Sequence, residues 1–208
     1  MPKVSEEHRQ ERCQEILNAC ESLYRTQGFS GVTIKAIGER TSFTRPAIYT
    51  YFETKDEILL ALFCREYDIW CERLEIIAQQ AASFSAEALA QAIAHSLADR
   101  DVLLRIQCMN LFEIENNSRV ERLADFKRRF QRMSQALRTI LQAYRPTVTE
   151  EVCLSFCRTF SSFLFGVYPF SFHTETQRQA MALAGVHFPE ADIQTMVADC
   201  LLCLLRAL

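Results

Sequence analysis

No stretch of this chain is long and apolar enough to cross a membrane, since its most apolar segments, residues 160–172 and 200–208, are short or interrupted. The first eight residues also lack the apolar core of a secretion signal. Glycine and proline are scarce, with five of each in 208 residues, and they stand mainly at the boundaries of periodic apolar segments. These absences predict a cytoplasmic protein with an all-α fold.

Catalytic signatures are missing as well. The chain has no Gly-x-Ser-x-Gly turn, phosphate-binding loop, His-Glu-x-x-His helix or dinucleotide-binding glycine fingerprint, and its four histidines are scattered. We therefore expect a protein that is not an enzyme and needs no cofactor or metal. A helical enzyme and a helical adaptor that binds only other proteins stay open as alternatives.

Cysteine is abundant, with nine residues, and most of them occur in pairs spaced three, four or seven apart. These spacings place each pair on one face of a helix, where a free thiol packs like a small apolar group. The pairs are Cys13 and Cys20, Cys64 and Cys71, Cys153 and Cys157, and Cys200 and Cys203. Reduced, buried thiols are the favoured reading, and a thiol- or metal-sensing role is the alternative.

Charge of one sign does not dominate, since the net charge is −3 and the isoelectric point is near 5.9. A generic nucleic-acid binder would be basic, so any DNA-binding surface must be local. Residues 33–55 carry four basic residues against two acidic ones. DNA backbone contacts made there would also use hydroxyls, tyrosines and helix N-termini.

The same segment reads as two short helices joined by a tight turn. Thr33 is placed to cap the first helix, whose apolar positions Ile34 and Ile37 point inward. Gly38 would let the second helix approach closely, and Phe43 after the turn would return to the core.

The second helix begins with a cap at Thr44 and has Pro46 in its first turn, where no backbone hydrogen bond is lost. Ile48 and Phe52 would face the core. The outward positions then carry Arg45, Ala47, Tyr49 and Tyr51. A polar and aromatic helix of this kind, small at its entry, suits end-on insertion into a DNA major groove. The pattern predicts a helix-turn-helix.

Three motifs in this region resemble the DNA-binding domain of TetR-type bacterial transcriptional repressors over about residues 10–63. They are Gln27-Gly-Phe29, the run from Ile48 to Phe52, and Lys55 followed by Ile58-Leu59. The chain departs from that family at Gly38, where alanine is common, and at Ser42, where the turn usually has glycine. The resemblance implies DNA contacts from Thr33, Lys35, Thr44, Arg45, Pro46, Ala47, Tyr49, Tyr51 and Lys55.

The rest of the chain shows helical periodicity throughout. The apolar pattern predicts helices over residues 12–26, 55–80, 86–99, 103–115, 120–144, 150 to 165 or 168, and 191–208. Together with the resemblance, it implies a helix-turn-helix domain of three helices over residues 1–56 and a helical ligand-binding and dimerisation domain over residues 57–208.

The helices after Thr149 and at the C-terminus are apolar nearly all round. They resemble the last helices of the family, which pair with their copies in a second subunit. The expected dimer interface comprises Phe156, Phe160, Leu164, Met196, Val197, Cys200, Leu201 and Leu204. Packing of both helices inside one monomer is the alternative.

Helical bundles place ligand sites between helices, lined by apolar and aromatic side chains. The candidate lining residues are Tyr67, Trp70, Met109, Phe112, Phe126, Phe130, Phe160 and Phe163, with Glu113 as a possible partner for a cation. They favour an apolar or aromatic small molecule as the ligand of such a site, while plain core is the favoured interpretation of each residue taken alone.

The predicted helix over residues 120–144 also has a basic side, formed by Lys127, Arg128, Arg129, Arg132 and Arg138. A solvated charged face is the favoured reading, with a second DNA contact or an acidic-ligand site as alternatives. Taken together, the sequence predicts a homodimeric repressor that binds a palindromic double-stranded DNA operator and is released by a small-molecule effector. A thiol- or metal-sensing regulator of the same fold is the alternative.

Overall fold

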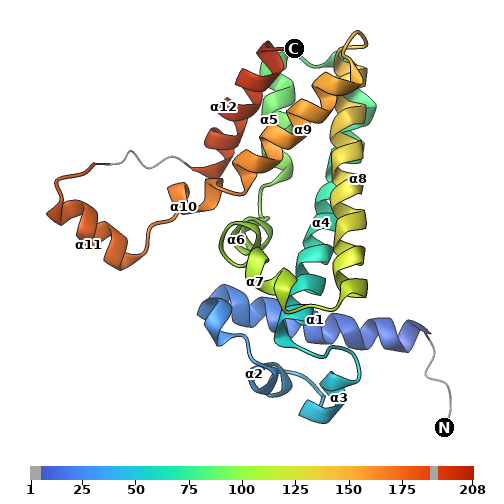
Figure 1. Cartoon of the computed structure of the whole chain (residues 1–208), viewed down its shortest axis with the longest axis vertical. Coiled ribbons are helices and arrows are strands. Elements are labelled where there is room, and N and C mark those ends of the chain that lie inside the picture. The colour runs from blue at the N-terminus through green and yellow to red at the C-terminus, as the bar shows by residue number, and fades with distance from the viewer. Residues whose placement is uncertain (1–5, 188–191) are drawn as a thin grey trace. The chain divides into compact units, whose positions relative to one another are not determined.

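The computed structural model describes residues 6–187 and 192–208, and these ranges contain helices and no β-strand (Figure 1). The predicted all-α fold is therefore confirmed. No helix in the described ranges combines the length and hydropathy needed to cross a membrane. The chain forms two compact units, which are described separately below.

The first unit runs to Tyr67 and also includes Asn110–Arg129. It contains α1 (Glu6–Gly31), α2 (Ile34–Gly38), α3 (Arg45–Tyr49), the start of α4 (Lys55–Gln80), α7 (Leu111–Asn116) and the start of α8 (Val120–Tyr144). Gly28 has φ 71° and ψ −168°, which interrupts the α-helical path of α1 close to the predicted end of that helix. The largest fully buried side chains of this unit include Tyr24, Phe52, Phe63, Tyr67 and Phe126.

The second unit comprises Asp68–Met109 and Phe130–Leu208. Besides the remainders of α4 and α8, it contains the 3-10 turn η1 (Ala81–Ser83), α5 (Ala86–Ser96), α6 (Asp101–Met109), α9 (Glu150–Leu164), α10 (Val167–Ser171), α11 (Glu175–Leu183) and α12 (Ile193–Arg206). Helix α12 packs chiefly on α5 and also touches α9 and α10. The core of this unit is centred on Trp70, Leu89, Ile93, Phe160 and Leu201, all fully buried.

Three predicted helices differ from the observed ones. The helix expected over residues 103–115 is two helices, because the backbone leaves the α-region at Asn110 (φ −134°, ψ −11°). The helix expected to reach residue 165 or 168 ends at Leu164, and a separate helix, α10, begins after Gly166. The last helix begins at Ile193 with the Asp192 side chain as its cap, while its predicted start at residue 191 lies outside the described residues.

Helix α11 was not predicted, because its sequence has no continuous apolar face and it buries no residue. A local signal for it does exist. Thr174 accepts a hydrogen bond from the backbone N–H of Gln177, and the Gln177 side chain accepts one from the N–H of Thr174, which forms a capping box. The helix therefore begins from local hydrogen bonding rather than from burial.

Candidate DNA-binding interface

Helix α2 is held by the cap and the two apolar residues that the sequence predicts. Thr33 has an extended backbone (φ −134°, ψ 153°), and its hydroxyl accepts a hydrogen bond from the Ala36 N–H at 3.0 Å. Ile34 and Ile37 are buried beneath it. The close approach attributed to Gly38 needs no glycine, because a Cβ there would lie 3.6 Å from Arg45 Cγ and 3.8 Å from Ile48 Cδ1, ordinary contact distances.

The turn between α2 and α3 is tied to α1 by one carboxylate. Glu15 accepts the backbone N–H of Ser42 at 2.5 Å and the Ser42 hydroxyl at 3.1 Å. Phe43 is buried after the turn, as expected, and its ring meets the Tyr51 ring edge-on at 6.1 Å. Sequence reasoning missed Glu15, since nothing local distinguishes it from the other polar residues of α1.

Helix α3 presents its polar side outward. Ile48 is fully buried, whereas Thr44, Arg45, Pro46 and Tyr49 are exposed. Thr44 occupies the N-cap position but makes no side-chain cap bond, so the predicted cap is wrong in that respect. Arg45 has no carboxylate partner among the described residues. A guanidinium left uncompensated on an exposed helix start is available to a phosphate or a base edge.

The remaining predicted contact residues surround this helix in the first unit. Thr33 and Lys35 are exposed at the start of α2, and Ala47 and Tyr51 are half-buried beside α3. The Lys55 ammonium lies 3.9 Å from the centroid of the Phe29 ring, which orients it at the beginning of α4. The structure thus gathers all nine residues in one compact unit, and their contacts with DNA stay a prediction.

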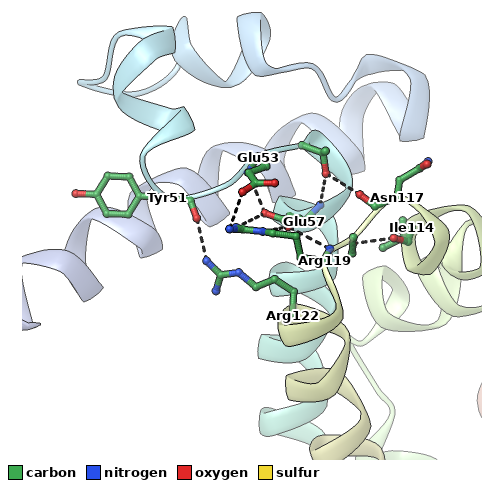
Figure 2. A network of polar contacts seen from close by, with 9 residues as sticks. Tyr51, Glu53, Glu57, Ile114, Asn117, Arg119 and Arg122 are labelled. Atoms are coloured by element: carbon green, nitrogen blue, oxygen red, sulfur yellow. Dashed lines mark hydrogen bonds and ion pairs between the residues drawn. The ribbon is translucent and has the colours of Figure 1, made fainter.

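A polar network joins the segment after α3 to the junction between α7 and α8 (Figure 2). Glu57 is fully buried and accepts hydrogen bonds from Arg119 Nε at 2.6 Å and Nη2 at 2.8 Å, and from the Glu53 N–H at 2.9 Å. Arg119 Nη1 also lies 2.8 Å from Glu53 Oε1. Burial by itself would raise the pKa of the Glu57 carboxyl, but its bonds to Arg119 and to the Glu53 N–H hold that pKa below its ordinary value.

Three further hydrogen bonds belong to this network. The Thr54 hydroxyl donates to the Asn117 carbonyl at 3.1 Å and accepts the Glu57 N–H at 3.1 Å. Arg122 Nη2 donates to the Tyr51 carbonyl at 2.9 Å. We call the set Thr54, Glu57, Asn117, Arg119 and Arg122 the junction network. It attaches the segment that follows the recognition helix to residues more than sixty positions further along the chain.

Sequence reasoning missed four members of the junction network, Glu57, Asn117, Arg119 and Arg122. The spacing of Thr54 and Glu57 matches a capping motif and would have indicated Glu57. Arg119 and Arg122 carry no such signal, because their partners are set by tertiary packing. Asp56 is another missed residue, since it is buried with one oxygen, Oδ1, lacking a hydrogen-bond partner among the described residues.

The basic side of α8 is largely neutralised by carboxylates. Lys127 lies 2.6 Å from Glu115, Arg128 pairs with Asp125, and Arg132 lies 2.7 Å from Glu75. Arg138 likewise pairs with Glu150, and Arg129 donates to the Asp125 carbonyl. Cations that already hold carboxylates are poor phosphate ligands, so this side fits the solvated charged face better than a second DNA contact.

The residues predicted to line a ligand site have contrasting surroundings. Tyr67, Trp70, Phe126 and Phe160 are fully buried side chains. Met109, Phe112 and Glu113 are exposed, with Phe112 82% accessible. Phe130 and Phe163 are half-buried, and Phe130 borders a hollow of about 340 Å³ between α8 and α9. These placements leave the ligand site a prediction, with Phe130 beside an open volume.

The residues predicted for a dimer interface also divide by exposure. Phe156, Phe160, Leu164, Val197 and Leu201 are buried within the protomer, where they fill its own core. Met196, Cys200 and Leu204 on α12 are partly exposed and are therefore accessible to a second subunit.

The cysteines form no disulfide in the described part of the chain, and most of them are buried. Burial raises the pKa of the Cys20 thiol to about 12 and also raises that of Cys157. No cluster of three or more His, Cys, Asp or Glu side chains able to hold a metal ion occurs in the described residues. Cys203 is the exposed member of the set.

Buried isoleucines anchor α2 and α3 from beneath, and the exposed side of α3 carries no acidic residue. This is the arrangement of a helix-turn-helix transcriptional regulator. Family comparison supports this class. Residues 16–62 match the model described as bacterial regulatory proteins, tetR family, and residues 64–208 match the model described as tetracyclin repressor-like, C-terminal domain. The chain belongs to the TetR family of bacterial regulatory proteins, so the resemblance seen in its motifs is confirmed.

Curated relatives are similar over the DNA-binding region. The chain is 37% identical over 57 residues to the uncharacterized HTH-type transcriptional regulator YfiR of Bacillus subtilis, which is 27% of this chain and 28% of that protein. It is 32% identical over 62 residues to the HTH-type transcriptional repressor Rv1474c of Mycobacterium tuberculosis, or 30% of this chain and 33% of that protein. The chain thus matches about a third or less of the length of either relative.

Solved structures resemble the whole chain. A transcriptional regulator of the TetR/AcrR family from Thermobifida fusca has a TM-score of 0.61 at 18% identity, covering 94% of this chain and 97% of that one. The fatty acid degradation regulator FadR from Bacillus halodurans has a TM-score of 0.60 at 15% identity, covering 94% and 98%. At such low identity these likenesses show the fold alone.

Proposed function

We propose that this protein is a homodimeric repressor that binds a palindromic operator and is released by a small-molecule effector. The observation that carries the proposal is the exposed face of α3, where Arg45 and Tyr49 are accessible while Ile48 anchors the helix from beneath. Binding to chromosomal DNA would place its action in the bacterial cytoplasm.

In this proposal α3 enters the major groove by its N-terminal end. Arg45 would donate two hydrogen bonds to a guanine edge, and the small Ala47 would allow a close approach to a thymine methyl group. Lys55 and the hydroxyl of Thr33 would hold phosphates on either side. These contacts separate base reading, assigned to α3, from positioning, assigned to α2 and to the start of α4.

Dimerisation would use the accessible side of α12. Met196, Cys200 and Leu204 offer apolar surface there, and dimers are typical of the family. A two-fold protein matches an operator of two half-sites about 34 Å apart, or a multiple of that distance.

The effector would bind in the second unit, where the hollow lined by Phe130, Leu154 and Phe165 offers about 340 Å³ of partly apolar volume. Trp70 supplies an optical probe of that unit. Its indole N–H donates to the Ser96 hydroxyl at 2.9 Å inside the core, so rearrangement around it should change its emission. Helix α4 carries both Lys55 and Trp70, which gives a path from effector to DNA contact.

A gel shift with DNA from upstream of the protein's own gene tests the proposal. We expect a complex that survives excess random DNA and weakens steeply with salt. A compound that changes Trp70 emission should lower the affinity of the protein for this DNA by about 5- to 150-fold, the typical range of allosteric coupling between two sites. Absence of any sequence-specific complex would favour an adaptor or an enzyme instead.

A further inference from the structure

A second concentration of positive charge lies outside the helix-turn-helix, at a hollow of about 290 Å³ in the first unit. Helix α1 contributes four of its lining residues, and the others are Tyr51 and a residue of α8. The lining consists of Arg9, Gln10, Cys13, Gln14, Tyr51 and Arg122. It includes two guanidinium groups and no carboxylate, so its potential favours an anion.

Arg122 is held in place by contacts that leave most of its donors unused. Its Nη2 donates to the Tyr51 carbonyl at 2.9 Å, and its guanidinium carbon lies 5.2 Å from the Phe52 ring centroid. A guanidinium has five N–H groups in a fixed planar fork, and this one is oriented before any ligand arrives.

Arg9 supplies the second charge without any internal role. It is exposed and has no hydrogen-bond or ion-pair partner among the residues that the structure describes. Glu11, two residues further along α1, lies 3.5 Å from His8 and is not part of the lining. Arg9 is therefore available to whatever enters the hollow.

Other basic residues on the same part of α8 behave differently. Lys127 and Arg128 hold Glu115 and Asp125, so their charges are compensated within the protein. Among the described residues, Arg122 contacts a neutral carbonyl and an aromatic ring instead. Unlike Lys127 and Arg128, Arg122 thus brings its charge to the hollow without a carboxylate partner in the part of the chain that the structure describes.

We propose that this hollow is a phosphate-binding subsite, and that its ligand is a DNA backbone phosphodiester beside the half-site read by α3. Tyr51 follows the end of α3 by two residues and links the recognition helix to the hollow. Two guanidinium groups suit a phosphate, because Arg can donate two parallel hydrogen bonds to its oxygens. This inference rests on the proposed operator binding and extends the footprint to α1 and α8.

The test is the salt dependence of DNA binding by the full-length protein. Arg9→Ala and Arg122→Ala should each reduce the slope of log K against log salt, and the double variant should reduce it by about 0.9, the value of one lost phosphate contact. Both variants should weaken operator and random DNA by the same factor. Arg128→Ala, on the same helix but paired with Asp125, is the matched control and should leave the slope unchanged.

Arg122 also supports the Tyr51 carbonyl, so its variants need a readout that a supporting role would not change. If support were its whole function, Arg122→Ala would weaken operator binding with the salt slope intact. Arg122→Lys keeps the charge and should keep most of the slope. If Arg122→Ala melts at a lower temperature than the wild type, the salt slope of Arg9→Ala alone tests the subsite, because Arg9 has no hydrogen-bond or ion-pair partner among the described residues.

The outcomes separate this inference from the proposed function. A wild-type protein that forms no salt-sensitive operator complex would contradict operator binding itself. A wild-type complex with normal slope, together with unchanged slopes for Arg9→Ala and Arg122→Ala, would overturn the subsite alone. Inorganic phosphate that raises the melting temperature of the wild type but not of Arg9→Ala, at constant ionic strength and with unchanged DNA slopes, would assign the hollow to a free anion and refute the DNA source.

Discussion

At the scale of single residues, the interface is distinguished by Arg45, an exposed cation at the start of α3. Arg45 has no carboxylate partner in the described part of the chain. The Lys55 ammonium lies over the Phe29 ring and partly offsets the burial that raises the pKa of the neighbouring Asp56 carboxyl. The basic residues of α8 beyond Arg122 pair with acids or a carbonyl. An uncompensated cation loses little by contacting DNA, since no internal ion pair must be broken.

Substitutions of Arg45 and Lys55 should have different effects, because we assign base reading to Arg45 and a phosphate contact to Lys55. Arg45→Ala should cost about 1–3 kcal/mol on the operator and relax the preference at one base pair, because a bidentate contact to guanine is lost. Lys55→Ala should weaken all sequences alike and reduce the salt slope by about 0.9. Anisotropy titrations with operator and random duplexes measure both. Equal effects of the two variants on both duplexes would refute the assigned roles.

At the scale of elements, the segment after α3 is fixed by the junction network as well as by its own helix caps. Glu57 and Asp56 are adjacent buried acids at the start of α4 with opposite surroundings. Arg119 and the Glu53 N–H hold the pKa of Glu57 low against its burial. Burial raises the pKa of Asp56, with Glu113 adding to the increase and Lys55 and Asn117 opposing it.

The two acids should therefore give opposite pH dependence to the free energy of unfolding. Because the pKa of Glu57 is depressed in the folded protein, its stabilising effect is present above its ordinary value of 4.5 and is lost as pH falls through the folded pKa. Glu57→Gln should cost about 1–3 kcal/mol at pH 7, and that cost should shrink as the pH falls below the ordinary carboxyl value of 4.5.

Asp56 has a raised pKa, so its ionised form destabilises the fold and protonation relieves that cost. Relative to Asp56→Asn, the wild type should become more stable as pH falls. Urea unfolding at several pH values gives the free energy of unfolding of both variants. Glu53→Gln is the control, because it removes the exposed carboxylate partner of Arg119 and leaves both buried acids in place. Parallel pH profiles for Glu57→Gln and Asp56→Asn would contradict this account of the network.

Sequence patterns predicted the helix-turn-helix well because its determinants are local. Apolar spacing, the Thr33 cap and Pro46 all act within a few residues, and the structure places Ile34, Ile37 and Ile48 inward as expected. The junction network could not be predicted, because Arg119 reaches Glu57 across sixty-two positions. Helix α11 was missed since it has no buried face to produce a periodic signal.

At the scale of the whole molecule, exposure decides which predicted interface residues are available. Five of the eight lie in the protomer's own core, whereas Met196, Cys200 and Leu204 are accessible on α12. An apolar helix needs cover on several sides, and a protomer's core satisfies part of that need before any partner binds. The periodic apolar pattern alone does not distinguish residues buried in the protomer's own core from residues buried by a second subunit.

A charge on the accessible side of α12 should break the dimer and leave the protomer folded. Met196→Asp or Leu204→Asp would bury an unpaired carboxylate in the proposed interface. Sedimentation should then give a monomer with wild-type circular dichroism, and operator affinity should fall because the half-sites are no longer held together. Gln194→Asp, at an exposed polar position of the same helix, is the control. A dimer that persists in both variants would place the interface elsewhere.

The central claim is that a dimer of this protein reads two DNA half-sites through α3. The most direct test compares its affinity for three duplexes of equal length, which carry two half-sites, one half-site or a scrambled sequence. Binding of the intact protein is measured at one salt concentration, with the operator taken from its own upstream DNA. The account predicts that the full operator binds at least about 10³-fold more tightly than the scrambled duplex. It also predicts that the single half-site lies between them and that Arg45→Ala removes most of the difference. Equal affinity for all three duplexes would contradict an operator-binding dimer that reads DNA through α3.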